Sequence, residues 1–247
     1  MGKDKKSKKE LLREWFIKII KYLFILLSIV FAILLIINGG FNLKDEIEKN
    51  SGMWENVIKV YVGIGLLTFT PVLDSILFKE TELSSKIDFQ DSKFSNGNKE
   101  RLDLFNKRMK GTLLFWKNNV KIYRNLHYYS VIWTTLISVV MPILIQLINS
   151  GGKLLITIIS AHSAILIAFH KGIKIENNYK RFRICESNFY DAYREILDYH
   201  GSNQEEDEKK IREYFNIVRA IRKDGRETEI DNIPNVDYSN IKKGKNE

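Results

Sequence analysis

Four long apolar runs constrain this chain more than any other feature of its sequence. They cover residues 16–37, 57–78, 130–148 and 154–169. A helix needs about 20 apolar residues to cross the hydrocarbon core of a bilayer, and its backbone is then satisfied internally. The sequence therefore predicts an all-α integral membrane protein with four spans. The second run carries Pro71 and Asp74, so a buried helix that does not cross fully is the alternative there.

The basic residues are distributed unevenly among the segments outside these runs. Six Lys or Arg residues lie in 1–15, eleven in 79–129 and sixteen after residue 169, whereas 39–56 holds two lysines against four acidic residues. Basic loops remain in the cytoplasm. We therefore expect a multi-pass protein of the cell inner membrane with both termini cytoplasmic. The short "NSGGK" turn between the last two runs would then lie outside.

The boundaries of these runs divide the chain into five segments. They are a basic cytoplasmic tail (1–15), a two-span hairpin (16–79), a cytoplasmic loop (80–97), a helical domain with the last two spans (98–225) and a loose C-terminal tail (226–247). We expect the last helix to begin at a capping box formed by Ser202 and Glu205 and to end near Gly225.

Apolar residues recur every seven positions in the two polar segments that flank the third and fourth spans, which predicts a packed seam along each helix. We expect the two helices to meet as an antiparallel pair in the cytoplasm, each continuous with its span over about 45–50 residues. Packing within one chain and assembly with further copies both fit the aromatic-rich seams. The seam residues are Leu102, Met109, Trp116, Tyr123, Ile175, Phe182, Phe189 and Ile196.

The C-terminal half resembles the SLATT family, the SMODS and SLOG-associating two-transmembrane effector domains. The resemblance covers roughly residues 95–235 and is carried by "YRNLHYYS", two spans with a minimal turn, "NNYKRFRICESNFYDAYREIL" and "RAIRKDGRETEIDNIPNV". The N-terminal pair of spans departs from the two-span pattern of that family. The resemblance implies a bacterial effector that oligomerises and forms a pore, or perturbs the membrane, in a nucleotide-signalled antiviral or conflict system. It brings no catalytic residues.

Two polar or small faces mark the last two spans. Residues three or four apart lie on one side of a helix, so these faces fit either close helix packing or a polar stripe that lines a conduction path in an oligomer. The first comprises Thr134, Ser138, Pro142 and Gln146, and the second comprises Thr157, Ser160, Ala164 and Ala168.

Among the ionisable residues inside the apolar runs, His162 and Asp74 are the ones that could have a functional role. An ionisable group in a membrane is costly to bury and should face protein or water. For His162 the main expectation is a hydrogen bond to a neighbouring helix, with proton or ion sensing as the alternative. Asp74 would either reach the membrane interface, pair with Lys79, or attract cations if it were buried.

Enzyme and metal motifs are absent from the sequence. It contains no HExxH, CxxC, GxSxG or phosphate-loop pattern, and its four histidines lack the spacing of metal ligands. We therefore expect no enzymatic activity, cofactor or metal. The single cysteine, Cys185, falls on a seam and should be buried and inert. The expected partners are the lipid bilayer, further copies of the chain and a nucleotide-signalling or sensor protein, but no nucleic acid.

Two other functional classes remain open at this point. The chain could be a constitutive ion channel or transporter subunit, since the stripe on the third span is polar. It could equally be a non-conducting scaffold that recruits partners through its cytoplasmic helices. The trigger, the number of subunits and the ion preference leave no signature in the sequence.

Overall fold

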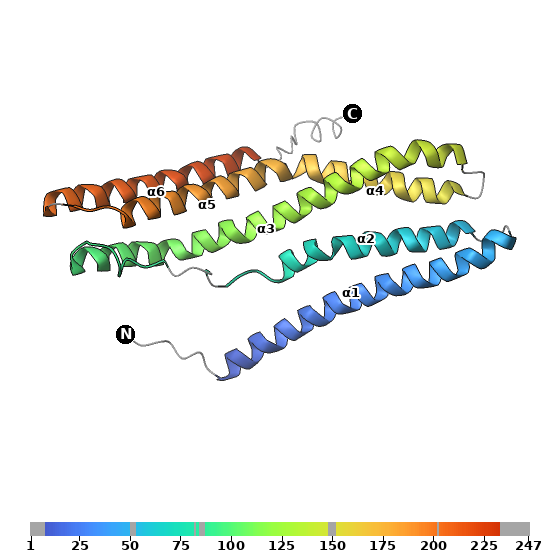
Figure 1. Ribbon diagram of the computed structural model, residues 1–247, viewed down its shortest axis with the longest axis horizontal. Helices are drawn as coiled ribbons and strands as arrows, with labels where there is room; N and C mark the ends of the chain where they lie inside the picture. Colours follow the sequence, from blue (N-terminus) through green and yellow to red (C-terminus); the bar gives the residue numbers. More distant parts are fainter. Residues whose placement is uncertain are drawn as a thin grey trace, which may run out of the picture. The chain divides into compact units, whose positions relative to one another are not determined.

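Helices are the only regular secondary structure over the residues that the computed structural model describes, which are 8–49, 53–81, 83, 87–147, 152–201 and 203–232. The helices are α1 (Lys8–Lys49), α2 (Met53–Leu77), α3 (Asn96–Leu147), α4 (Lys153–Gly172), α5 (Ile175–Leu197) and α6 (Gln204–Asn232) (Figure 1). Four of them carry apolar stretches long enough to cross a bilayer: Trp15–Gly40, Trp54–Leu77, Asn96–Gln146 and Lys153–Gly172. The predicted all-α multi-pass membrane protein is therefore confirmed.

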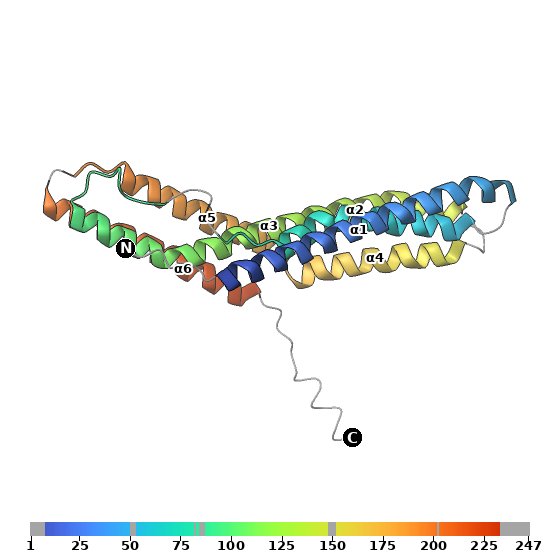
Figure 2. The same cartoon turned by 90° about the horizontal axis from the view of Figure 1, so that it is seen from below.

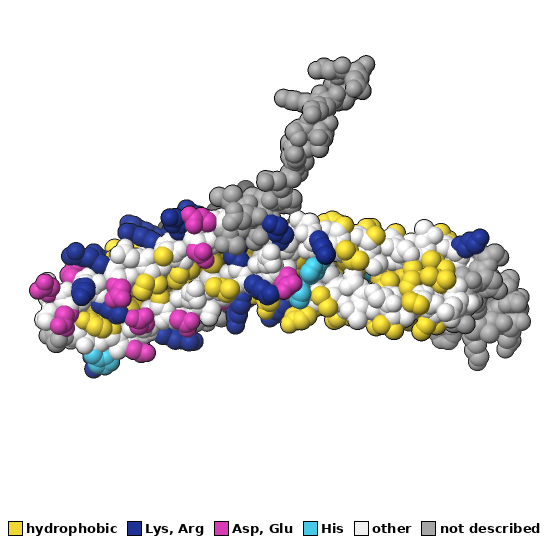
Figure 3. All heavy atoms as spheres, turned by 90° about the horizontal axis from the view of Figure 1, so that it is seen from above, with side chains coloured by type: hydrophobic (Ala, Val, Ile, Leu, Met, Phe, Trp, Pro, Cys, Tyr) yellow, Lys and Arg dark blue, Asp and Glu magenta, His cyan; other side chains and the backbone are white. Residues whose placement is uncertain are grey.

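The helices form two compact units. The membrane unit contains residues up to 79 together with 128–167, and the polar unit contains 80–127 together with the chain from 168 onward. Figure 3 shows how charged side chains gather over the polar unit, whereas the visible face of the membrane unit carries few. Helix α3 belongs to both units, so the division cuts through the segment 98–225 that the sequence suggested as one domain.

Within the membrane unit, α1 and α2 run side by side at very short range (Figures 1 and 2). A Cβ atom added to Gly63 would lie 2.7 Å from the carbonyl oxygen of Ala32, and one added to Gly39 would lie 2.7 Å from that of Asn56. Glycine is therefore required at both crossings, because it lets the two backbones approach. At the other end of the pair, Lys21 Nζ donates to the carbonyl oxygen of Leu77 at 2.8 Å and satisfies the last turn of α2.

A second apolar core in the membrane unit joins α2, α3 and α4. Trp133 and Ile137 of α3 are buried against Leu155, Ile159 and Leu166 of α4, with one face of α2 beside them. Helix α1 contributes little to burial, since only 6% of its apolar window is buried. An apolar surface of this length is expected where lipid rather than water surrounds the helix.

The core of the polar unit is built from α3, α5 and α6 around the predicted seams. Seven of the eight seam residues are buried and the eighth, Tyr123, is half-buried. Helix α6 completes this core with Ile211, Tyr214 and Val218. The segment before α3 contributes as well, because Phe89 is fully buried there. The sequence had indicated only a loop at this point.

The expectation of one continuous helix on each side of the membrane hairpin is right for α3 and wrong for α4 and α5. Helix α3 runs uninterrupted for 52 residues. Helix α4 ends at Gly172, and α5 begins at Ile175 after Lys174, which adopts the left-handed conformation with φ 47° and ψ 50°. The break is fastened by Asn178, whose Nδ2 donates to the carbonyl oxygen of Ile173 at 2.8 Å. Apolar spacing misses it because the periodicity continues across the break.

The start and end of α6 also differ from the prediction. Asn203 caps the helix, since its Oδ1 accepts a hydrogen bond from the backbone nitrogen of Glu206 at 2.9 Å. Ser202, the predicted cap, lies outside the described residues. The helix continues past Gly225 to Asn232. Gly225 marks a close contact with α5, because a Cβ atom there would lie 3.0 Å from Cys185 Sγ. The tail beyond Asn232 lies outside the described residues.

Candidate functional site

His162 is the centre of a hydrogen-bonded cluster in the membrane unit. Its Nδ1 lies 2.6 Å from the hydroxyl of Tyr61 on α2, and its Nε2 lies 3.3 Å from the hydroxyl of Tyr129 on α3. Close by, Trp133 Nε1 donates to Thr68 Oγ1 at 2.9 Å, and its ring meets Tyr61 edge to face. A single imidazole on α4 therefore joins two other helices.

The hydrogen-bonding partners in this cluster can accommodate His162 in any protonation state. A phenol hydroxyl both donates and accepts, so the two tyrosines can partner either neutral tautomer of His162 and also its protonated form. The geometry matches the expected hydrogen bond to a neighbouring helix, extended to two helices. The tyrosines were missed in the sequence because they lie 101 and 33 residues from His162, too far apart to form a motif.

The predicted stripe on α3 lies away from the core of its own chain. Thr134 is half-buried, and Ser138, Pro142 and Gln146 are exposed. The Thr134 hydroxyl donates to the carbonyl oxygen of Ser130, and the Ser138 hydroxyl donates to that of Thr134, each at 2.7 Å. These bonds make the hydroxyls tolerable in a lipid-facing helix.

The small-residue face of α4 has the same outward position. Thr157, Ser160, Ala164 and Ala168 are all exposed, whereas Leu155, Ile159 and Leu166 carry the packing. Neither face is used for close packing within the described part of the chain. Both are available to lipid or to another copy, and a water-filled path lined by them would need several chains.

Asp74 does not meet the condition set for a cation-attracting group. It is half-buried and lies in the last turn of α2. Lys79, five residues further along the chain, is exposed. The position near the end of the span fits a carboxylate that reaches the interface.

A second histidine pair joins α3 to α4 in the polar unit. Nδ1 of His127 and Nε2 of His170 are 3.1 Å apart, which is the distance of a hydrogen bond. The pair lies just before the helix break at Lys174, and Glu176, bonded to Lys180 at 2.6 Å, is close behind it. Among the described residues, no group of three or more side chains could hold a metal ion.

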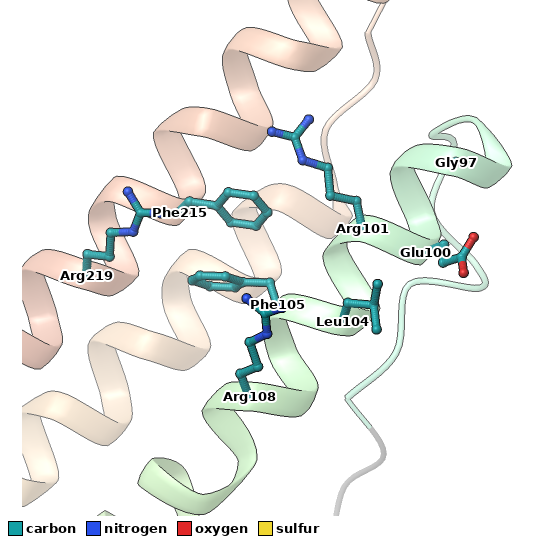
Figure 4. Close-up of a pocket in the computed structure, with 8 residues that line it drawn as sticks. All are labelled: Gly97, Glu100, Arg101, Leu104, Phe105, Arg108, Phe215 and Arg219. Atoms are coloured by element: carbon teal, nitrogen blue, oxygen red, sulfur yellow. The ribbon is translucent and has the colours of Figure 1, made fainter.

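The polar unit also carries a groove between α3 and α6 that the sequence did not reveal (Figure 4). It has a volume of about 400 Å³. Phe105 and Phe215 stack within it at a centroid distance of 4.2 Å, and arginine side chains surround them. The available signal was the spacing of Arg219, Arg222 and Arg226, which places three cations on one side of a helix. The full lining is Gly97, Glu100, Arg101, Leu104, Phe105, Arg108, Phe215 and Arg219.

Comparison with known proteins identifies no relative. No family model, no curated protein and no solved structure gives a significant match to this chain. The functional argument therefore depends on the geometry of the two units.

Proposed function

We propose that the protein is a triggered membrane effector. A signal received by the polar unit repositions the third and fourth spans, and several copies together then permeabilise the bacterial inner membrane. The resemblance to SLATT domains favours an antiviral or conflict system as the setting. Lipid, further copies of the chain and a nucleotide-signalling or sensor protein are the partners in this proposal.

The observation that carries the proposal is the continuity of α3. Leu102, Met109 and Trp116 are buried in the core of the polar unit, and Trp133 and Ile137 of the same helix are buried in the core of the membrane unit. An α-helix transmits rotation and translation along its axis because each turn is hydrogen-bonded to the next. A rearrangement of the polar core would therefore move the third span directly.

The break between α4 and α5 allows these two helices to change direction relative to each other while α3 stays continuous. A left-handed non-glycine residue costs about 1–2 kcal/mol, so Lys174 marks a joint that tertiary packing maintains. Such a joint can absorb a change in helix direction, whereas an unbroken α3 cannot. The His127–His170 bond lies beside the joint and would open or shift as the joint moves.

The outward faces of α3 and α4 fit assembly between copies. Small residues allow close contact of membrane helices, and exposed hydroxyl and amide groups can line water once copies meet. Gln146 and Ser138 are exposed along one side of α3, and Ser160 and Ala164 along one side of α4. A ligand or partner can drive this transition only if it binds the assembled arrangement more tightly than the unassembled one.

The proposal is tested by recording membrane potential in bacteria that express the chain, with and without phage infection as the trigger. We expect depolarisation only after infection. Steady conductance without infection would favour the constitutive channel, and stable complexes without any conductance would favour the scaffold.

A matched pair of triple variants tests the stripe. We expect Thr134→Ala, Ser138→Ala and Gln146→Ala together to change ion flow after the trigger. The control combines Ile132→Ala, Leu136→Ala and Val140→Ala, which are exposed along a different side of α3 and should leave ion flow unchanged. Equal effects of the two triple variants, at equal expression in the membrane, would remove the stripe from the mechanism.

A further inference from the structure

The groove between α3 and α6 continues along α6 as a row of basic hollows. The hollow at Phe105 and Phe215 shares Arg219 with a second of about 390 Å³, which in turn shares Arg222 and Arg226 with a third of about 280 Å³. Volumes of this order suit small-molecule ligands. We call this row the arginine groove, and its guanidinium groups belong to Arg101, Arg108, Arg219, Arg222 and Arg226.

Within the described part of the chain the groove keeps a net positive charge, because five arginines and Lys223 line it against two carboxylates, Glu100 and Glu227. Arg108, Arg219, Arg222 and Arg226 form no ion pair with a described carboxylate, and only Arg101 is paired, with Glu208 at 2.8 Å. Other cations of the polar unit do have such partners, as Lys117 and Lys210 show.

The spacing of these arginines makes them repel one another. Arg222 and Arg226 are four residues apart on α6, and Arg219 and Arg222 are three apart, so each pair consists of neighbouring like charges on the helix surface. Two of the four unpaired guanidiniums line a hollow that also contains stacked aromatic rings. An anion bound across the groove would relieve this repulsion and form charge-assisted bidentate hydrogen bonds.

The aromatic residues narrow the class of anion. Phe105 and Phe215 are half-buried, so part of each ring remains open to the groove, and Arg101 lies 5.6 Å from the centroid of Phe215. Figure 4 shows the two rings next to each other with Arg101, Arg108 and Arg219 around them. Further along, Phe115 is 48% exposed beside Arg222 and Arg226. Exposed rings among guanidiniums provide a stacking surface for a base beside a site for phosphate.

We propose that the arginine groove binds a nucleotide, with the phosphates on Arg219, Arg222 and Arg226 and the base against Phe215. The arginines extend over about 10 Å of α6 at 1.5 Å per residue, which matches a chain of several phosphates. A bare inorganic phosphate would leave the aromatic surface unused. This inference supplies a ligand for the proposed effector. Only the effect of binding on the membrane rests on the proposed function, because binding itself is measured without any conductance.

The test uses the full-length protein in detergent micelles and a fluorescent analogue of adenosine triphosphate. We expect saturable binding that weakens as salt rises, because the contacts are mainly ionic. Unlabelled adenosine, guanosine, cytidine and uridine triphosphates should each compete, since stacking tolerates any base. Replacing Arg219, Arg222 and Arg226 together by Gln should weaken binding at least about tenfold.

Two variants locate the ligand. A control triple of Lys180→Gln, Arg194→Gln and Arg212→Gln removes the same charge from exposed positions outside the groove and should leave binding within about twofold. Phe215→Leu should weaken competition by the nucleotides several-fold and leave competition by inorganic triphosphate unchanged.

The competitors distinguish the possible sources of phosphate. Inorganic triphosphate that competes as well as the nucleotides would overturn the base site. Competition by a water-soluble, short-chain phosphoinositide, but not by nucleotides, would assign the groove to lipid headgroups instead. Equal losses in the two triple variants, or no saturable binding at millimolar nucleotide, would also overturn the proposal. If nucleotides bind but never alter membrane potential, the site stands and the proposed effector function fails.

Discussion

The contact between α1 and α2 yields the sharpest structural prediction, because two glycines of the same helix have opposite surroundings. A Cβ atom on Gly63 would lie 2.7 Å from both the carbonyl oxygen of Ala32 and Cγ1 of Ile36. A Cβ atom on Gly65 would have no neighbour within 4 Å. Gly63→Ala and Gly65→Ala therefore make the same chemical change two residues apart, and only the first requires α1 to move.

The magnitude follows from two opposing contributions. Replacing a mid-helix glycine by alanine gains up to about 1 kcal/mol of helix propensity in water, and this contribution is common to both variants. Overpacking at Gly63 costs about 1–3 kcal/mol, since a backbone oxygen cannot rotate away as a side chain can. We therefore expect the free energy of unfolding of Gly63→Ala to lie about 1–3 kcal/mol below that of Gly65→Ala.

The assay is equilibrium unfolding in mixed micelles of a mild detergent and dodecyl sulfate, followed by loss of helical circular dichroism. A second pair of variants, Gly39→Ala and Gly40→Ala, repeats the comparison on α1. A Cβ atom on Gly39 would lie 2.7 Å from the carbonyl oxygen of Asn56, whereas one on Gly40 would have no neighbour within 4 Å. Equal stability within each pair would refute the close crossing of α1 and α2.

Three further predictions concern other parts of the chain. Tyr61→Phe removes the 2.6 Å hydrogen bond to His162 and should lower the free energy of unfolding by about 0.6–1.7 kcal/mol in the same micelles. The control Tyr22→Phe keeps its ring on Phe78 and should change the free energy of unfolding by less. Equal losses in the two variants would contradict a role for the hydroxyl of Tyr61. Lys174→Gly should raise the melting temperature, because glycine adopts the left-handed conformation at no steric penalty. The control Lys171→Gly, inside α4, should lower the melting temperature by weakening the helix. A lower melting temperature for both variants would show that Lys174 is unstrained. Burial raises the pKa of Tyr214, so above pH 10 the unfolded chain loses this proton before the folded one and the stability of the polar unit falls. Chemical denaturation of Tyr214→Phe from pH 8 to 11 should therefore show a smaller loss of stability at alkaline pH. An unchanged slope of stability against pH would assign that loss to other groups.

The elements that the sequence predicted well are those whose signal is local and repeated. The four spans were predictable because each is an apolar run of near-membrane length, and the seams around Met109 and Phe189 because seven-residue spacing keeps side chains on one line. Both patterns depend on residues a few positions apart, and tertiary packing adds little to them. The fully buried positions of Leu102 and Phe189 in the core of the polar unit agree with this reasoning.

The features that the sequence did not predict depend on long-range contact or on single backbone angles. Tyr61 and His162 meet only because α2 and α4 pack in one core, and no spacing rule joins residues that far apart. The break at Lys174 is a matter of one φ value within an apolar periodicity that continues on both sides. Gly225 looked like a helix end, but it marks a close contact with Cys185, a choice that composition alone cannot make.

The arginine groove shows a third limit. Arg101 and Arg219 lie on different helices, and each helix alone presents an ordinary charged face. The concentration of charge arises only when α3 and α6 pack beside each other around Tyr214. A spacing of three and four residues in "VRAIRKDGR" was visible, yet without the partner helix it indicated no more than a solvated surface.

The central claim is that four helices cross the membrane and leave the polar unit on one side of it. Accessibility labelling tests this directly, with single cysteines at Glu46, Lys110, Asn149 and Lys209 in a Cys185→Ala background. An impermeant maleimide added to intact bacterial spheroplasts should label the cysteines at positions 46 and 149 at once, and those at 110 and 209 only after permeabilisation. Labelling of positions 110 and 209 from opposite sides, or of 46 together with 110 before permeabilisation, would contradict four crossings and the coupling built on them.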